Sequence, residues 1–113
     1  MSDEQSERWQ HQIRALSPKI AEAEVSVFRA EADVKKLQAK LELTAMANGA
    51  KTISMQKTLA DNDPTLYEAR LKVGIAKGSL SGLKIELKSI EVGFDEWRTK
   101  MASAREEKKR YGA

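Results

Sequence analysis

Cationic side chains recur at one position of a seven-residue repeat in the second half of this chain. The row is interrupted only at Glu91. Regularly spaced cations can follow the phosphates of a nucleic-acid backbone without reading its bases. The members of the row are Arg70, Lys77, Lys84, Arg98 and Arg105.

Two further groups of cations lie outside this row. Lys51 and Lys57 precede it, and the C-terminal end reads Lys108-Lys109-Arg110-Tyr111, with an aromatic side chain that could stack on a base. No Gly-x-x-x-x-Gly-Lys-Ser/Thr phosphate loop accompanies them. The residues predicted to contact nucleic acid are Lys51, Lys57, Arg70, Lys77, Lys84, Arg98 and Arg105.

A second interpretation of the same cations is structural. Glu24, Glu31 and Gln38 occupy the equivalent repeat position in the first half of the chain, so they can pair with the cationic row across a helical hairpin. In the simplest register Glu31 lies near Lys77 and Lys84. Cations at a helix C-terminus are also stabilised by the helix dipole. Ion pairing and nucleic-acid contact therefore remain alternatives.

Catalytic and metal-binding residues are scarce. The chain has no cysteine and one histidine, His11, which excludes thiolate sites, multi-histidine metal sites and most triad chemistry within one chain. Asp61, Asp63 and Glu68 resemble part of a calcium loop, but the glycine at the turn and the other ligands are missing. We expect no enzyme activity, no metal and no cofactor.

Length and composition favour one long-helix domain. The chain has 113 residues, of which 33% are charged and only two are proline, and its formal net charge is +3. No apolar run approaches the ~20 residues that span a bilayer, and the start Ser2-Asp3-Glu4-Gln5 is unlike a signal peptide. We expect a cytoplasmic protein that does not contact a membrane.

The elements that position these residues follow from heptad repeats. A long helix is predicted over residues 64–111, because apolar residues fill both the a and d positions of a coiled-coil seam. The a positions are Leu66, Val73, Leu80, Leu87, Phe94 and Met101, and the d positions are Ala69, Ala76, Leu83, Ile90, Trp97, Ala104 and Tyr111.

A second seam predicts a first helical arm over residues 9–47, after a frayed stretch 1–8. Its a positions are Ile13, Ile20, Val27, Val34 and Leu41, and its d positions are Trp9, Leu16, Ala23, Ala30, Leu37 and Thr44. Pro18 falls on the outward side of this seam. Ser17-Pro18 reads as an N-cap followed by a first helical residue, so we expect a short first helix and a kink or restart there.

The connector is predicted over residues 48–63. Asn48-Gly49 tolerates the left-handed conformation that ends a helix. Residues 54–60 could form one or two helical turns, capped by Thr52 or Ser54. Asp63-Pro64 is a strong start for the second long helix.

Together the two seams predict an all-α fold, an antiparallel hairpin of long helices in coiled-coil packing. If Thr44 lies near Leu66, Ile13 faces Trp97 and Trp9 faces Met101. Ala23 or Ala30 would then meet the glycine run 74–82.

A second apolar stripe follows the side of the 64–111 helix away from its seam. It includes glycines that each cost about 1 kcal/mol relative to alanine in a helix, which suggests close packing against another helix. The alternative is a surface helix with scattered apolar residues. The predicted oligomer interface consists of Leu71, Ile75, Gly78, Gly82, Ile85 and Val92, with Ser89 on the same stripe.

Three short motifs resemble those of phage recombination mediators of the UvsY family. They are residues 58–64 (Thr-Leu-Ala-Asp-Asn-Asp-Pro), residues 94–100 (Phe-Asp-Glu-Trp-Arg-Thr-Lys) and Arg105-Glu106-Glu107. The resemblance covers about residues 20–111, and this chain lacks the more elaborate oligomerising tail of the best-known mediator. It implies a homo-oligomeric protein of the host-cell cytoplasm that binds single-stranded DNA and helps to load a recombinase.

Two classes of function therefore stand side by side. The first is a non-catalytic, homo-oligomeric mediator on single-stranded DNA, with a recombinase as a further partner. The second is a structural or adaptor hairpin that assembles through protein contacts, with itself or with another phage or host protein, and binds no nucleic acid.

Overall fold

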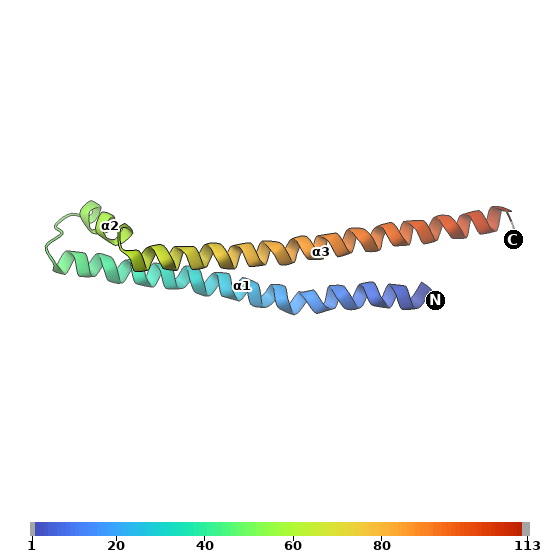
Figure 1. Cartoon of the computed structure of the whole chain (residues 1–113), viewed down its shortest axis with the longest axis horizontal. Helices are drawn as coiled ribbons and strands as arrows, with labels where there is room; N and C mark the ends of the chain where they lie inside the picture. The colour runs from blue at the N-terminus through green and yellow to red at the C-terminus, as the bar shows by residue number, and fades with distance from the viewer. Residues whose placement is uncertain (1, 112–113) are drawn as a thin grey trace. The chain divides into compact units, whose positions relative to one another are not determined.

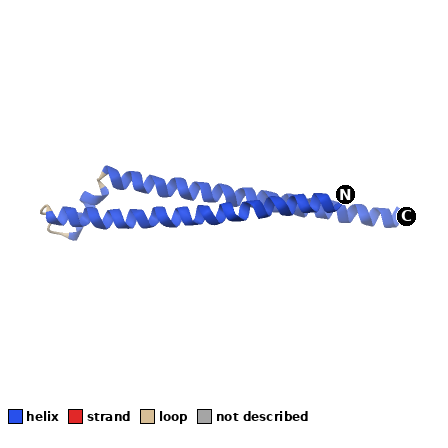
Figure 2. Cartoon of the chain, turned by 90° about the horizontal axis from the view of Figure 1, so that it is seen from below, coloured by secondary structure: helices blue, strands red, loops and turns tan. Residues whose placement is uncertain are grey.

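The computed structural model describes residues 2–111, and all of its regular structure is helical. Three helices follow one another: α1 (Ser2–Ala47), α2 (Ile53–Asp61) and α3 (Pro64–Tyr111). Short loops separate them (Figures 1 and 2). The predicted all-α hairpin of long helices is confirmed.

The chain divides into two compact units, which we describe separately. The connector unit, residues 21–81, contains the C-terminal part of α1, all of α2 and the first part of α3. The terminal unit consists, among the described residues, of 2–20 from α1 and 82–111 from α3. Within each unit the two long helices run antiparallel (Figure 1).

The predicted seams coincide with the protected faces of both long helices. On α3 every a and d position from Leu66 to Met101 is buried or half-buried, and on α1 the same holds from Trp9 to Leu41. The seam of α3 was predicted too long, because Ala104 and Tyr111 are exposed. The described part of α1 starts only seven residues before Trp9. Trp9 lies beside Phe94, so the described part of α1 extends along α3 for one heptad beyond Phe94.

Pro18 does not interrupt α1. The predicted restart is wrong, because α1 is one helix from Ser2 to Ala47 and Pro18 lies inside it. The hydroxyl of Ser17 donates to the carbonyl of Ile13 at 3.4 Å instead of capping a new helix. A proline inside a helix costs about 3 kcal/mol, and the seam packed on both sides of Pro18 offsets that cost. The stretch expected to be frayed is helical from Ser2, and Met1 lies outside the described residues.

The C-terminus of α1 is tied to the core of the connector unit. Gly49 has a φ of 105°, the left-handed conformation expected after a helix. The amide of Ala50 then donates to the carbonyl of Ala45 at 3.0 Å. Both alanines are buried, whereas Thr44, the predicted d residue, is exposed. The seam prediction fails at Thr44 because the last turn of α1 is placed by this closing hydrogen bond.

Helix α2 is held at both ends by hydrogen bonds. The Thr52 hydroxyl caps it by accepting from the amide of Met55 at 3.1 Å, which selects Thr52 from the two predicted caps. The side-chain amide of Gln56 donates to the carbonyl of Ala50 at 3.0 Å. At the other end the backbone amide of Asn62 donates to the carbonyl of Thr58 at 3.1 Å, and Ala60 is buried. Together with Leu66 and the two alanines at the end of α1, Ala60 forms the core of the connector unit.

Asp63 caps α3 as predicted. Its carboxylate accepts from the Thr65 amide at 2.8 Å and also from the Thr65 hydroxyl. These two hydrogen bonds, the hydroxyl first, hold the pKa of Asp63 below its ordinary value of 3.8. A depressed carboxyl pKa means that the stabilisation is present above the unfolded pKa and is lost as the pH falls through the folded one.

We therefore expect Asp63→Ala to lower the melting temperature at pH 7, and this deficit to shrink as the pH falls below 3.8. Asp63→Asn keeps a capping oxygen that does not titrate, so it should melt close to wild type at low pH. Melting followed by circular dichroism from pH 7 to pH 2 checks both variants. A deficit of Asp63→Ala that is independent of pH would contradict this role of the carboxylate.

Candidate nucleic-acid interface

The seven predicted cations are all exposed, and they fall into the two units. Lys51 lies in the loop before α2, and Lys57 lies on α2 itself. Four of the seven therefore belong to the connector unit and three to the terminal unit. The connector unit holds Lys51, Lys57, Arg70 and Lys77, and the terminal unit holds Lys84, Arg98 and Arg105.

Two of the connector-unit cations are engaged in ion pairs. Lys77 Nζ lies 3.4 Å from Glu31 Oε1, the pairing that the heptad register predicted. Arg70 pairs instead with Asp61 at the end of α2, at 2.8 Å, a partner that the heptad reasoning missed. Both pairs are largely exposed, so each stabilises the fold by less than about 1 kcal/mol. Their main consequence is that two of the four predicted cations in this unit are already partly neutralised.

The other predicted pairing partners do not join the cationic row. Gln38 donates to Glu42 along α1 at 3.4 Å. Among the side chains that the structure describes, residues 4–111, no ion pair within 4.0 Å involves Glu24, Lys84, Arg98 or Arg105. Ion pairing therefore accounts for Arg70 and Lys77 but not for the cations of the terminal unit.

In the terminal unit Arg98 belongs to an aromatic cluster. Its guanidinium lies 5.4 Å from the centroid of the Phe94 ring, in a cation–π contact. The Phe94 ring stacks on Trp97 with centroids 6.1 Å apart, and Trp9 from α1 approaches Phe94 at 6.3 Å. The spacing of Phe94 and Arg98, four residues apart on one helix, is the sequence signal that could have revealed this contact.

The position of Trp9 corrects the predicted register. A Cβ atom added at Gly93 would lie 3.0 Å from the Trp9 ring, so the indole packs on the bare backbone of Gly93. Trp9 therefore meets Gly93 and Phe94, about one heptad away from the predicted Met101. The prediction assumed a constant offset along the hairpin and did not consider that a glycine leaves room for the largest side chain.

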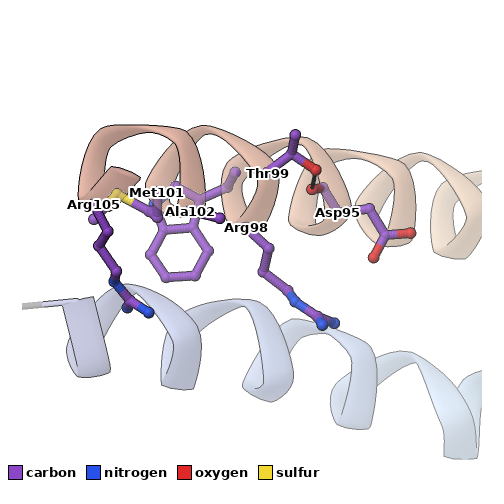
Figure 3. A pocket seen from close by; sticks show the side chains of 7 residues that line it. Asp95, Arg98, Thr99, Met101, Ala102 and Arg105 are labelled. Carbon is purple, nitrogen blue, oxygen red and sulfur yellow. Dashed lines mark hydrogen bonds between the residues drawn. The ribbon is translucent and has the colours of Figure 1, made fainter. Parts of the chain in front are cut away.

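A shallow hollow on α3 joins the cations to this cluster. Figure 3 shows Arg98 and Arg105 extending from α3 toward the facing helix, with Met101 between their positions. At ~1.5 Å rise per residue the two arginines are about 10 Å apart along the helix. The carboxylate of Asp95 adds one negative charge at the edge of this hollow. The hollow is lined by Asp95, Trp97, Arg98, Thr99, Met101, Ala102 and Arg105.

Chemically, this surface combines two exposed guanidinium groups with aromatic and apolar area. Arginine binds phosphate with a planar fork of donors, and bases stack on apolar or aromatic surfaces. The segment from Arg98 to Arg110 contains six basic residues and two acidic ones. Lys108, Lys109 and Arg110 occupy the last turn of α3, where they also complement the helix dipole.

The predicted oligomer interface is exposed along α3. In the connector unit Leu71 and Ile75 are 48% and 70% exposed, and a Cβ added at Gly78 meets nothing within 4 Å. In the terminal unit Ile85, Val92 and Gly82 are equally open. Gly74 in the glycine run is open as well, so the glycines of this run do not themselves pack against Ala23 or Ala30. These glycines lie on the side of α3 that α1 does not cover.

Other kinds of site are not found in the described part of the chain. No group of three or more histidine, cysteine or acidic side chains is placed to hold a metal ion there. None of the helices described is long and apolar enough to cross a membrane. No protein-family model, curated protein or solved structure is significantly similar to this sequence.

Proposed function

We propose that this chain is a non-catalytic, homo-oligomeric protein that binds single-stranded DNA and assists the loading of a recombinase. The observation that carries DNA binding is the surface around Arg98 and Arg105. There two exposed guanidinium groups, which have no ion-pair partner among the described side chains, border a hollow lined in part by Trp97. Recombinase loading rests on the resemblance of three short motifs to those of UvsY-like mediators, motifs that here include Trp97, Arg98 and Arg105.

The proposal distinguishes cations that would contact DNA phosphates from cations that already form ion pairs within the chain. This difference makes the proposal testable. Arg98 and Arg105 have no ion pair to give up among the described side chains before they contact phosphates. Arg70 and Lys77 would have to give up Asp61 and Glu31 first. We therefore expect unequal losses of affinity when either pair of charges is removed.

We expect the double variant Arg98→Gln/Arg105→Gln to bind a labelled oligothymidine about tenfold more weakly than wild type at low salt. The slope of log affinity against log salt should fall by about 1.4, since each lost phosphate contact on a single strand removes about 0.7. Fluorescence anisotropy across a salt series measures both quantities.

The control is Arg70→Gln/Lys77→Gln, which removes the same formal charge from the connector unit. It should change the affinity and the salt slope much less. Equal losses in both double variants would show a general charge effect and contradict the assignment to the terminal unit. Circular dichroism verifies that both variants remain helical.

The second candidate is a structural or adaptor hairpin that assembles through protein contacts alone. The large apolar side chains exposed on all three helices favour it, among them Phe28 on α1 and Ile75 on α3. It predicts an oligomer that retains no oligothymidine even at low salt, whereas the mediator binds it most tightly under those conditions.

A further inference from the structure

The connector unit has a second unpartnered face, on α1, which the heptad reasoning did not single out. Phe28 is 74% exposed and Val25 is 51% exposed. Val25 borders a shallow hollow with Ala21, Glu22 and Arg29. Ala21, Val25, Phe28 and Ala32 step by four, three and four residues, which is the spacing of a heptad seam, on the side of α1 away from α3. An exposed phenylalanine within such a seam indicates a helical partner.

In the same unit, the face of α3 turned away from α1 has open space where the α1 face has bulky side chains. Gly74 and Gly78 leave open space above the backbone, and Leu71 and Ile75 flank them. Each glycine inside a helix costs about 1 kcal/mol relative to alanine. A bulky side chain from another helix that fills this space would recover the cost through close packing. The bulky face of α1 and the small face of α3 therefore complement each other in shape.

The exposed area of the chain supports a partner of substantial size. The chain exposes 8915 Å². A folded monomer of 12.6 kDa exposes about 6,200 Å², which leaves an excess of about 2,700 Å². A standard protein interface buries about 800 Å² on each partner, so the excess is enough for two interfaces on every chain.

We propose that a second copy of this chain covers each of these faces, with Val25 and Phe28 of one copy packed against Gly74 and Gly78 on α3 of the next. Two unlike faces on opposite sides of the hairpin make the contact head-to-tail, so the copies form a closed ring or a filament. This inference rests on the self-association included in the proposed function, and it is independent of DNA binding.

A mixing experiment tests the pairing of the two faces. Val25→Ala/Phe28→Ala removes the bulky face, and Gly78→Leu fills the small one. Both changes lie outside the seam between α1 and α3, because Val25 and Phe28 are exposed and Gly78 has open space above it. Each variant alone should lose the oligomer in light scattering. Their mixture restores one intact interface, so it should give pairs of about 25 kDa, two chains of 12.6 kDa each.

The control is Ile53→Ala on α2, a similarly exposed side chain outside both faces, which should leave the mass unchanged. If only Gly78→Leu dissociates the oligomer and the mixture does not pair, the contact joins two α3 faces and the head-to-tail proposal is overturned. If the wild-type chain is a monomer at high concentration, the proposal that the chain associates with itself is wrong. Oligothymidine binding, measured separately, then decides whether the DNA-binding part of the function survives.

Discussion

Replacing Leu66 with alanine is expected to lower the free energy of unfolding by about 2–4 kcal/mol. Leu66 is the one large side chain in the described residues that is completely buried. The rest of the connector-unit core is alanine: Ala45, Ala50 and Ala60. Small neighbours cannot move far enough to fill the space that a missing isobutyl group leaves, so most of the cavity cost should persist.

The comparison variant is Leu71→Ala, the same substitution five residues later on α3, at a side chain that is 48% exposed. Urea unfolding followed at 222 nm measures both, at one fixed chain concentration because self-association would add to the apparent stability. We expect a large loss in the free energy of unfolding for Leu66→Ala and a small loss for Leu71→Ala. A larger loss at Leu71 would mean that the outward face of α3, not the connector core, holds the fold together.

The second large effect is expected at Trp9. Trp9→Ala removes the ring that packs on Gly93 and approaches Phe94, and it should cost about 2–3 kcal/mol, less than a fully buried tryptophan because Trp9 is half-buried. The loss should concentrate in the terminal unit. The fluorescence of the remaining tryptophan, Trp97, should shift toward that of an indole in water, because Trp97 stacks on Phe94.

Trp9→Phe separates ring packing from hydrogen bonding. The indole nitrogen of Trp9 is buried and has no hydrogen-bond partner in the part of the chain that the structure describes. A phenyl ring therefore loses area but no hydrogen bond, and the cost should stay below about 1.5 kcal/mol. Tyr111→Ala, at a side chain that is 79% exposed, should leave stability unchanged. A cost of Trp9→Phe equal to that of Trp9→Ala would indicate that the ring packing shown here is not what stabilises this end.

The heptad pattern predicted the fold because it states which side of each helix is covered. Leu66 and Leu16 were placed on the seams, and both are buried. The start of α3 at Pro64 and the end of α1 at Ala47 followed from capping chemistry, which depends on neighbouring residues alone.

The misplaced details depend on contacts between distant residues. Trp9 packs against Gly93 because a glycine on the other helix leaves space, and no periodicity shows which glycine will be opposite. Ser17-Pro18 has the composition of a helix start, but the seam on both sides keeps the helix continuous. At Thr44 a closing hydrogen bond from Ala50 overrides the last step of the repeat.

The candidate site was predicted in part. The charge row correctly identified exposed cations and the pairing of Lys77 with Glu31. It did not reveal the pairing of Arg70 with Asp61, which depends on how α2 folds back. It also missed the contact between Arg98 and Phe94 in the terminal unit.

The most direct test of the proposed function is size-exclusion chromatography with light scattering, with and without a labelled oligothymidine at low salt. It reports self-association and single-strand binding in one measurement. We predict a mass of at least two chains of 12.6 kDa, about 25 kDa or more, without DNA, and label that co-elutes with the protein and is released as salt is raised. A monomer that retains no label at low salt would contradict the proposal.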